Sequence, residues 1–396
     1  MIQITDKHDC CGCWACIQRC PKQCISMKED EEGFLYPKVD INLCINCELC
    51  EKVCPIHNPG VSLSPLKVYV AKNLDERIRK DSSSGGIFTL LAESIISKGG
   101  VVFGARFNEN WNVIHDYTET IQGLANFRGS KYIQSQVGNA FSQVEQFLKQ
   151  GRPVLFSGTP CQVAGLRRFL RAPYDNLFLV DFICHGVPSP RIWQQYLFET
   201  IMSVHNKDSK DGIQIEKISF RDKSFGWKRF SLSLSFSCSG EAHLIKEPLD
   251  KNEYLKGFQA NLYLRPSCYF CKAKGWRSGS DITIADAWRI GGYMPDFDDD
   301  KGTSLVSILT TNGLHYFDSL YKAGKICVRE VCEDFIRNAN PSAFISAIPH
   351  KMRDKFFECI KNGKDFDSTI RICLPEPTYL DKVIWSIKRR LQNLKY

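Results

Sequence analysis

Apolar and polar residues recur with two different periods in the part of the chain that follows residue 66. The segment KVYVAKN at 67–73 favours a strand, and the segment after it carries four apolar residues at helical spacing behind Ser84, the expected N-cap. VVFGARF and NVIHDYT again favour strands, and a further helix is predicted over 137–150.

A buried strand, a tight turn and a helix then follow one another twice. GRPVLFSGTPCQVAGLRRFL places Cys161 in the first turn of a helix, and LFLVDFICHGVPSP places Cys184 and His185 at the end of a strand. Strands that alternate with helices predict an α/β domain, in which ligands gather at the carboxyl ends of the strands. After about residue 212 the pattern becomes β-rich, and from about residue 341 it favours helices.

The first 60 residues follow neither period, because cysteines dominate them. Two runs, CCGCWACIQRCP and CINCELCEKVCP, share the spacing C-x2-C-x2-C-x3-C-P. Zinc sites ordinarily use two close pairs of cysteines separated by a longer loop. Three thiolates at intervals of two residues instead wrap three corners of a cubane, while the fourth reaches the other cluster. The repeat therefore predicts two [4Fe–4S] clusters in a small bacterial ferredoxin fold.

This spacing assigns four cysteines to each cluster, with crossed ligation. The first cluster is expected to take Cys10, Cys13, Cys16 and Cys54. The second is expected to take Cys44, Cys47, Cys50 and Cys20. Cys11 and Cys24 fall outside the pattern, and we interpret them as small buried thiols beside the clusters.

Composition and charge narrow the class of protein. The chain begins without a signal peptide pattern and has no run of 18 apolar residues, so we expect a cytoplasmic protein without a transmembrane segment. In that compartment its 19 cysteines favour ligands over disulfides. The formal net charge is +8, but Lys and Arg are scattered and no nucleic-acid motif accompanies them. An acidic redox partner or a phosphate-bearing cofactor accounts for the charge, and no nucleic acid is expected.

Three further patterns indicate chemistry in the body. Cys268 and Cys271 form an isolated C-x2-C; with Cys161 and Cys184 they offer four thiolates for a third iron–sulfur cluster or for a zinc ion. His185 is either a proton donor to a substrate or a residue that bonds the backbone. The SSSGG turn either holds a phosphate at a helix N-terminus or only caps the helix.

Six motifs make the chain similar to the coenzyme F-420 hydrogenase/dehydrogenase beta-subunit family (FrhB/FdhB-like), in a bacterial form with a fused ferredoxin head. They are, in order, SSSGGIFTLLAE, FRGSKYIQS, SGTPCQVAGLRRF, CHGVPSP, RPSCYFCKAKGWRSGSDITIADAW and DDKGTS. The resemblance implies FAD in the α/β body and a further [4Fe–4S] cluster close to it. It identifies as flavin contacts Ser84, Gly85, Gly86, Lys131 and Tyr132. It identifies as ligands of the third cluster Cys161, Cys184, Cys268 and Cys271.

The expected activity is that of an iron–sulfur flavoprotein oxidoreductase. Electrons enter at the ferredoxin head, pass through the clusters and leave from FAD to an unknown small-molecule acceptor, or run in reverse. His185 is the candidate catalytic residue. The resemblance also points to surface-polysaccharide pathways and does not establish use of coenzyme F-420. The alternative is a non-catalytic relay subunit that docks to a partner redox enzyme; in both cases a redox protein, a ferredoxin-like donor or an enzyme, is the expected partner.

We therefore predict a multidomain chain of α+β and α/β class. The expected regions are a ferredoxin-type domain at 1–60, a flavin-associated α/β region at 67–150, a region with the third cysteine group at 151–340, and a helical tail at 341–396. The end of the tail, LDKVIWSIKRRLQNLKY, favours a basic amphipathic helix. That helix either packs on the body or makes a peripheral contact with a membrane or a partner.

Overall fold

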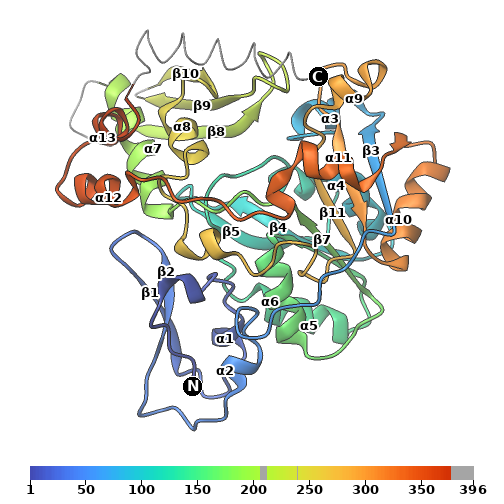
Figure 1. The fold of residues 1–396 in the computed structure, drawn as a ribbon, viewed down its shortest axis with the longest axis horizontal. Coiled ribbons are helices and arrows are strands. Elements are labelled where there is room, and N and C mark those ends of the chain that lie inside the picture. Colours follow the sequence, from blue (N-terminus) through green and yellow to red (C-terminus); the bar gives the residue numbers. More distant parts are fainter. Residues whose placement is uncertain (206–211, 239, 376–396) are drawn as a thin grey trace.

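The structure is a computed structural model that describes residues 1–205, 212–238 and 240–375. It has a small N-terminal head, a large central sheet covered by helices on both faces, and a second, smaller sheet beside it (Figure 1). This is a mixed α/β multidomain chain with a ferredoxin-like region at its N-terminus, as predicted. Within the described ranges no helix is long and apolar enough to cross a membrane.

The head repeats one backbone conformation in its two cysteine runs. Gly12 and Trp14 in the first run, and Asn46 and Glu48 at the same motif positions in the second, all have a left-handed backbone with φ between 53° and 66°. Each run then enters a short helix. The elements of the head are η1 (Lys7–Asp9), α1 (Ala15–Gln18), β1 (Ile25–Glu29), β2 (Leu35–Val39) and α2 (Leu49–Lys52), with β1 and β2 antiparallel.

The central sheet has the strand order β13-β3-β12-β11-β7-β6-β4-β5. Its four middle strands, β11, β7, β6 and β4, run parallel, and the flanking strands are antiparallel. The strands are β3 (Lys67–Asn73), β4 (Val101–Phe107), β5 (Val113–Thr118), β6 (Val154–Gly158), β7 (Leu177–Phe182), β11 (Ile282–Asp286), β12 (Ser304–Ile308) and β13 (Ile326–Glu330). Strands from both sides of residue 150 thus share one sheet.

Alternate residues of the middle strands enter different cores. Val154 and Phe156 of β6 pack with helices α5 (Ala140–Lys149) and α6 (Pro160–Leu170), whereas Leu155 packs with α4 (Ile87–Ile96) and α10 (Thr311–Lys322) on the other face. Helices therefore cover both faces, which explains why these strands are apolar almost throughout. The remaining elements around this sheet are α3 (Glu76–Asp81), η2 (Gln122–Asn126), η3 (Pro266–Phe270), α9 (Ile290–Tyr293), η4 (Pro295–Phe297), α11 (Glu333–Ala339) and η5 (Pro341–Ala343).

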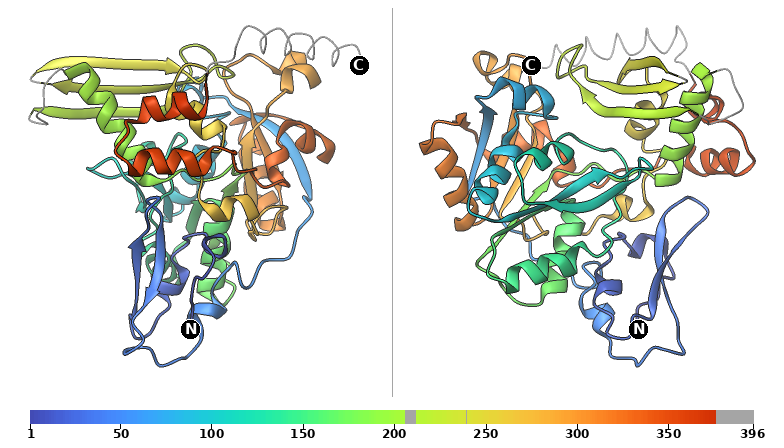
Figure 2. Two further views of the ribbon diagram at one scale, coloured as in Figure 1. Left: turned by 60° about the vertical axis from the view of Figure 1, so that its left-hand side comes forward. Right: turned by 180° about the vertical axis from the view of Figure 1, so that it is seen from behind.

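The smaller sheet is antiparallel and lies beside a helical layer (Figure 2). Trp193, Phe236, Tyr254 and Phe366 belong to the core that the sheet and these helices share. Its strands are β8 (Ile213–Asp222), β9 (Ser231–Cys238) and β10 (Glu241–Pro248), and the helices are α7 (Pro190–His205), α8 (Glu253–Gln259), α12 (Arg353–Lys361) and α13 (Phe366–Cys373). The predicted basic helix at the end of the tail falls on residues 376–396, outside the described residues.

The head shares a hydrophobic core with the body. Cys13, Ala15 and Val53 of the head pack in one cluster with residues of α6. Gly165 of α6 makes this approach possible, because a Cβ there would lie 2.9 Å from Cβ of Cys13. The head is therefore packed against α6 and not merely tethered to it.

The segment that joins the head to the central sheet, up to residue 66, lies along the body. The Ser62 hydroxyl donates to the carbonyl of Gly275, and the amide of Leu63 donates to the carbonyl of Trp276. A Cβ on Gly60 would lie 2.1 Å from the carbonyl oxygen of Arg277. Its Gly, Ser and Pro content thus serves close packing.

Helix α4 begins later than its sequence predicts. The N-cap is Gly86, with φ of 82°, and not Ser84. The Ser84 hydroxyl donates instead to the carbonyl of Thr303 at 2.7 Å, which joins the turn to the start of β12. A long-range partner has replaced the local cap.

We expect Gly85→Ala to destabilise the protein by about 1–3 kcal/mol. A Cβ on Gly85 would lie 2.4 Å from the carbonyl oxygen of Ala71 and 2.7 Å from the amide nitrogen of Ser304, both in the central sheet. Anaerobic thermal unfolding measures the effect. The control is Gly292→Ala, where a Cβ would meet nothing within 4 Å; equal midpoints for the two variants would contradict the argument.

Candidate functional site

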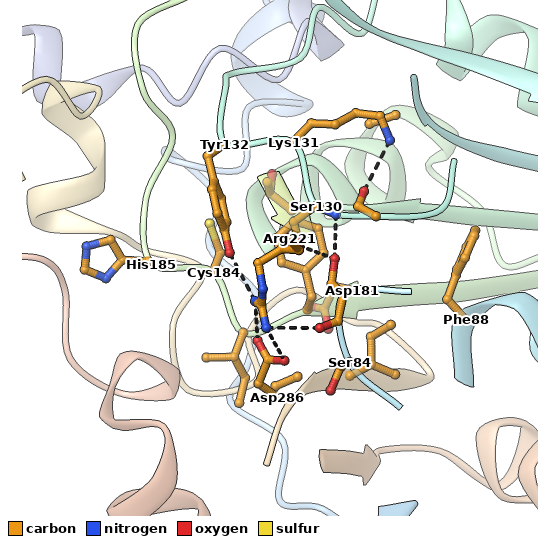
Figure 3. A pocket seen from close by; sticks show the side chains of 18 of the residues that line it. Ser84, Phe88, Ser130, Lys131, Tyr132, Asp181, Cys184, His185, Arg221 and Asp286 are labelled. Carbon is orange, nitrogen blue, oxygen red and sulfur yellow. Dashed lines mark hydrogen bonds and ion pairs between the residues drawn. The ribbon is translucent and has the colours of Figure 1, made fainter. Parts of the chain in front are cut away.

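A cavity of about 550 Å³ lies at the carboxyl ends of the parallel strands (Figure 3). Its wall is built from the SSSGG turn and the first turn of α4, the segment 127–135, the ends of β6, β7 and β11, and Arg221 of β8. This is the position where an α/β sheet ordinarily holds a ligand. Its volume suits a large organic molecule.

The SSSGG turn is fixed from several sides. Lys223 donates from Nζ to the carbonyls of Arg79 and Ser84, both at 2.9 Å, and Gly302 leaves room for the carbonyl of Ser84. Among the described residues no side chain caps α4, whose residues Ile87 to Thr89 line the cavity. The positive end of this helix therefore faces the cavity.

Lys131 brings a buried ammonium to the same wall. Its Nζ donates to the carbonyls of Arg128 and Gly129 at 3.3 and 3.2 Å, and no carboxylate of the described residues pairs with it. Burial lowers the pKa of Lys131 to about 7. A cation with only carbonyl partners favours an anionic ligand beside it.

Arg221 occupies the cavity wall as part of a closed polar group. Its guanidinium donates to both carboxylate oxygens of Asp286 at 2.8 and 3.0 Å and to the hydroxyl of Tyr132 at 3.1 Å. Asp286 also accepts from the indole of Trp227. Figure 3 shows the side chains of Arg221, Asp286 and Tyr132 pointing toward one another. Because its charge is paired, Arg221 orders the wall and positions Tyr132, whose ring stacks on Phe258.

A hydrogen-bonded chain runs through the wall behind β6. His115 donates from Nε2 to the carbonyl of Ser157 at 3.1 Å, so its Nδ1 accepts from the hydroxyl of Ser135 at 3.0 Å. Gln162 donates to Ser135, and the hydroxyl of Thr159 donates to Gln162 at 3.0 Å and lies 3.2 Å from Sγ of Cys161. Burial lowers the pKa of His115 to about 4. The imidazole is therefore neutral in the folded protein.

We expect the stability of the protein to fall between pH 6.5 and pH 5 in part because of His115. In this window the unfolded chain binds a proton at this imidazole and the folded chain does not, which costs about 1.4 kcal/mol per pH unit. The Gln of His115→Gln does not titrate. Anaerobic melts at pH 7 and pH 5 should therefore show a smaller loss for the variant; equal losses would contradict the assignment.

His185 lies beside Cys184 at another part of the cavity wall (Figure 3). Its Nε2 is 2.6 Å from Oδ1 of Asn261, and its ring meets Phe258 edge to face. Burial lowers the pKa of His185. The amide oxygen of Asn261 can only accept, so the neutral ring carries its proton on Nε2.

The predicted flavin contacts occupy different positions in the site. Ser84, Gly86, Lys131 and Tyr132 line the cavity, but Gly85 does not. The amide of Gly85 donates to the hydroxyl of Ser304. Because Gly85 packs closely against β3 and β12, as described above, this position has no room for a side chain.

The eight cysteines of the head line two separate small cavities. Cys10, Cys13, Cys16 and Cys54 line one of them, together with Cys11. Cys20, Cys44, Cys47 and Cys50 line the other, together with Cys24, whose Sγ is 3.4 Å from Sγ of Cys20. The fold thus brings together the two crossed sets that the spacing predicts.

The four cysteines of the body also converge, from three different elements. Cys161 lies in the first turn of α6, Cys184 follows β7, and Cys268 and Cys271 lie on and directly after η3. The Cys184 thiol interacts electrostatically with the other three. Burial raises the pKa of Cys268 to about 12, so a bound metal is needed to keep its thiolate. Cys184 also lines the large cavity, so the cysteine group and the cavity share a wall.

In the described part of the chain no three His, Cys, Asp or Glu side chains are close enough to hold one metal ion. Zinc would draw four thiolates to Zn–S distances of ~2.3 Å. A cubane takes its four thiolates at separate iron atoms, so a third iron–sulfur cluster and a zinc ion both stay predictions for the body cysteines.

His115, Arg221 and Gln134 are candidate functional residues that the sequence reasoning missed. Arg221 meets Asp286 across 65 positions, and His115 lies in the strand-like NVIHDYT without a motif around it. The one available signal was Asp286 at the end of a strand in SDITIADAW. Gln134 lies within FRGSKYIQS, but nothing local distinguishes it from its neighbours.

Comparisons with known proteins match two parts of the chain. Residues 151–334 match the family model for the C terminus of the coenzyme F420 hydrogenase/dehydrogenase beta subunit. Residues 9–58 match the 4Fe-4S dicluster domain.

Two curated relatives cover the head. An uncharacterised ferredoxin of Methanocaldococcus jannaschii is 34% identical over 77 residues, which are 19% of this chain and 92% of the relative. A 7Fe ferredoxin of Hydrogenibacillus schlegelii is 36% identical over 64 residues, 15% of this chain and 76% of the relative. Among solved structures, the xenon-derivatised F420-reducing [NiFe] hydrogenase complex from Methanosarcina barkeri contains a chain similar at a TM-score of 0.47 and 17% identity, covering 71% of this chain and 90% of that one.

Proposed function

Because the chain belongs to the coenzyme F420 hydrogenase/dehydrogenase beta-subunit family and carries a ferredoxin-type 4Fe-4S domain at its N-terminus, we propose that it passes electrons between three [4Fe–4S] clusters and FAD. The coarser statement, an iron–sulfur protein with a redox role, follows from the family itself. The number of clusters, the flavin and the acceptor are our proposals.

One observation carries the proposal: the wall that the body cysteines share with the large cavity. Cys184 belongs to the four-thiol group and lines the cavity at the same time. The Cys11 thiol interacts with the thiols of Cys13 and Cys161, between the head and this group. The head, the cysteine group and the cavity thus form one uninterrupted series from the surface to the ligand site.

The residues of the cavity suit FAD. The positive end of α4 and the buried ammonium of Lys131 together favour the diphosphate of a dinucleotide. The aromatic pair of Tyr132 and Phe258 and the apolar side chains of β7 and β11 offer surfaces for ring systems. When bound, FAD would pair single electrons from the clusters into a hydride equivalent.

The chain's own residues would bind FAD, orient the cavity wall around it and exchange a proton with the acceptor. Lys131 and the first turn of α4 would bind the anionic part, and Arg221, held by Asp286, would keep Tyr132 in place. His185, whose ring proton on Nε2 is bonded to Asn261, would accept a proton at Nδ1 and return it, with Asn261 fixing the orientation of the ring. These roles are consistent with His185 as the catalytic residue and with a small organic acceptor above the flavin.

The head supplies a surface for the redox partner. Cys47 is exposed, and Ile41, Leu43 and Ile45 near it are 69%, 57% and 57% exposed. A protein donor that docks here would come close to the second head cluster. The alternative, a relay subunit without a substrate, would use the same surface but would not need the cavity. The association with surface-polysaccharide pathways stays a prediction, and the use of coenzyme F-420 was not predicted.

Anaerobic purification with iron, sulfide, zinc and flavin analysis tests the proposal. Three [4Fe–4S] clusters give about twelve iron atoms per chain, with one FAD. About eight irons together with one zinc would overturn the third cluster, and failure to bind FAD after reconstitution would overturn the flavin. Reduction of the bound flavin by dithionite-reduced ferredoxin, followed by reoxidation with candidate organic acceptors, separates the enzyme from the relay.

A further inference from the structure

Arg265 is a buried cation at the junction of the head and the body. Its side chain is 1% exposed. The guanidinium donates from Nε to the carbonyl of Cys10 at 2.7 Å, from Nη1 to Oε1 of Gln134 at 2.9 Å, and from Nη2 to the carbonyl of Leu35 at 2.9 Å. Nη2 is also 3.5 Å from Sγ of Cys10. Arg265 thus reaches a sulfur of the first head cluster's ligand set.

Among the described residues no carboxylate pairs with this guanidinium. The groups around it that can carry negative charge include the thiols of Cys10, Cys11, Cys161 and Cys268 and the phenol of Tyr36. Its other neighbours are aromatic, with the Tyr36 ring centroid 4.3 Å from Cζ. A desolvated guanidinium with neutral partners alone is costly, so its environment calls for an anion.

The fold makes room for this approach. Gly12 has φ of 66°, and a Cβ there would lie 2.9 Å from Nη1 of Arg265 and 2.6 Å from Nε2 of Gln134. Gln134 in turn donates to the carbonyl of Cys11 at 3.1 Å. Arg265 is therefore held on two sides, and its charge has a fixed position relative to Cys10.

We propose that Arg265 is the fixed counter-charge of the cluster bound by Cys10, Cys13, Cys16 and Cys54, and that it raises the reduction potential of that cluster above the potential of the exposed head cluster. A cluster with four thiolates is an anion, and a one-electron reduction adds one further negative charge without forming or breaking a bond to Arg265. A buried positive charge stabilises the reduced form more than the oxidised form, because net charge and hydrogen bonds to sulfur set the potential. Transfer of an electron from the exposed cluster to the cluster beside Arg265 would then be favourable.

The proposal rests on the proposed function, because it needs clusters in the head. Iron content and the electron paramagnetic resonance of the reduced protein report whether the clusters are present. The midpoint potential, measured by titration with the same signal, reports what Arg265 does to them. Clusters with an unchanged midpoint would therefore overturn the role of Arg265 alone, and missing clusters in the wild type would overturn both.

The main variant is Arg265→Gln in the full chain, compared with Arg265→Lys. For Arg265→Gln we expect an unchanged iron content. The midpoint potential of one head cluster should fall by at least about 59 mV, which for a one-electron couple is a tenfold change in the equilibrium constant for reduction. Arg265→Lys keeps the charge and should recover at least half of that fall. The matched control is Arg353→Gln, since Arg353 joins the same head to the body but is paired with Glu32 and has no hydrogen bond to a cysteine among the described residues. An equal shift in the control, or folded Arg265→Gln protein without its head iron, would overturn the proposal.

If Arg265→Gln fails to fold, a second pair of variants tests the effect of the Arg265 charge on the midpoint potential. Gln134→Glu gives the guanidinium a carboxylate partner with almost no change in shape, and it should lower the same midpoint. Gln134→Leu removes the hydrogen bond without adding charge and should leave the midpoint within a factor of three. Equal midpoints in Gln134→Glu and Gln134→Leu would overturn the counter-charge.

Discussion

Replacing Cys268 with Ser should remove about four iron atoms per chain and leave the iron of the head in place. Cys268 belongs to the group of four body thiols, lies on η3 and lines neither of the two head cavities described above. A cubane that loses one of four thiolates is held weakly, and its loss should also stop reduction of the flavin from the head. Iron and sulfide analysis, together with single-turnover reduction of FAD, measures both effects.

The control for this variant is Cys327→Ser. Cys327 is an exposed cysteine of β13 that lines none of the three cavities described above. Its replacement should leave iron and electron transfer unchanged. If Cys268→Ser loses all of its iron, the residue supports folding of the whole chain and the assignment as a ligand is wrong.

Lys131→Met should weaken FAD binding by about tenfold to a hundredfold. The ammonium would form charge-assisted hydrogen bonds to an anionic ligand, each of about 1.5–3 kcal/mol. Among the described residues no carboxylate pairs with this ammonium, so its removal should not lower the midpoint of thermal unfolding of the flavin-free protein. Affinity falls while the stability of the ligand-free chain is maintained, a combination that a purely structural lysine would not give.

Fluorescence titration of reconstituted protein with FAD gives the affinity, and melts of flavin-free protein give the stability. The matched control is Lys98→Met, because Lys98 lies just beyond the other end of α4, over the ring of Tyr316. Its loss should leave FAD binding unchanged. If Lys131→Met binds FAD with unchanged affinity, the proposal of an anion site on this wall of the cavity is wrong.

Local patterns predicted much of the secondary structure. The strand at 67–73 and the order of strand, helix and strand from β6 through α6 to β7 are confirmed, because each is encoded by its own apolar residues and its own cap. The antiparallel side of the central sheet was not predicted. Its order places β3 between β12 and β13, and the pairing of such short strands is set by tertiary packing and not by their own residues.

The cysteine sets could be predicted from the sequence because the geometry of a cluster determines the spacing of its ligands. Three ligands of each head cluster lie within seven residues, so the motif itself specifies their geometry. Arg265 had no such signal, although it lies only three residues before Cys268. Its function depends on Cys10, which is 255 positions away, and on the absence of a carboxylate partner among the residues that the structure describes. Only a folded chain shows that a charge is unpaired.

The contact between α6 and the head has a further consequence for how electrons can travel. One helix carries Cys161 in its first turn and, at Gly165 one turn later, admits Cys13 of the head against its backbone. The segment that joins head and body is bonded to Gly275 and Trp276 through Ser62 and Leu63. The spacing between the proposed redox centres would therefore be set by the packing of head against body. Electrons would then pass between donor and acceptor without a movement of the head relative to the body.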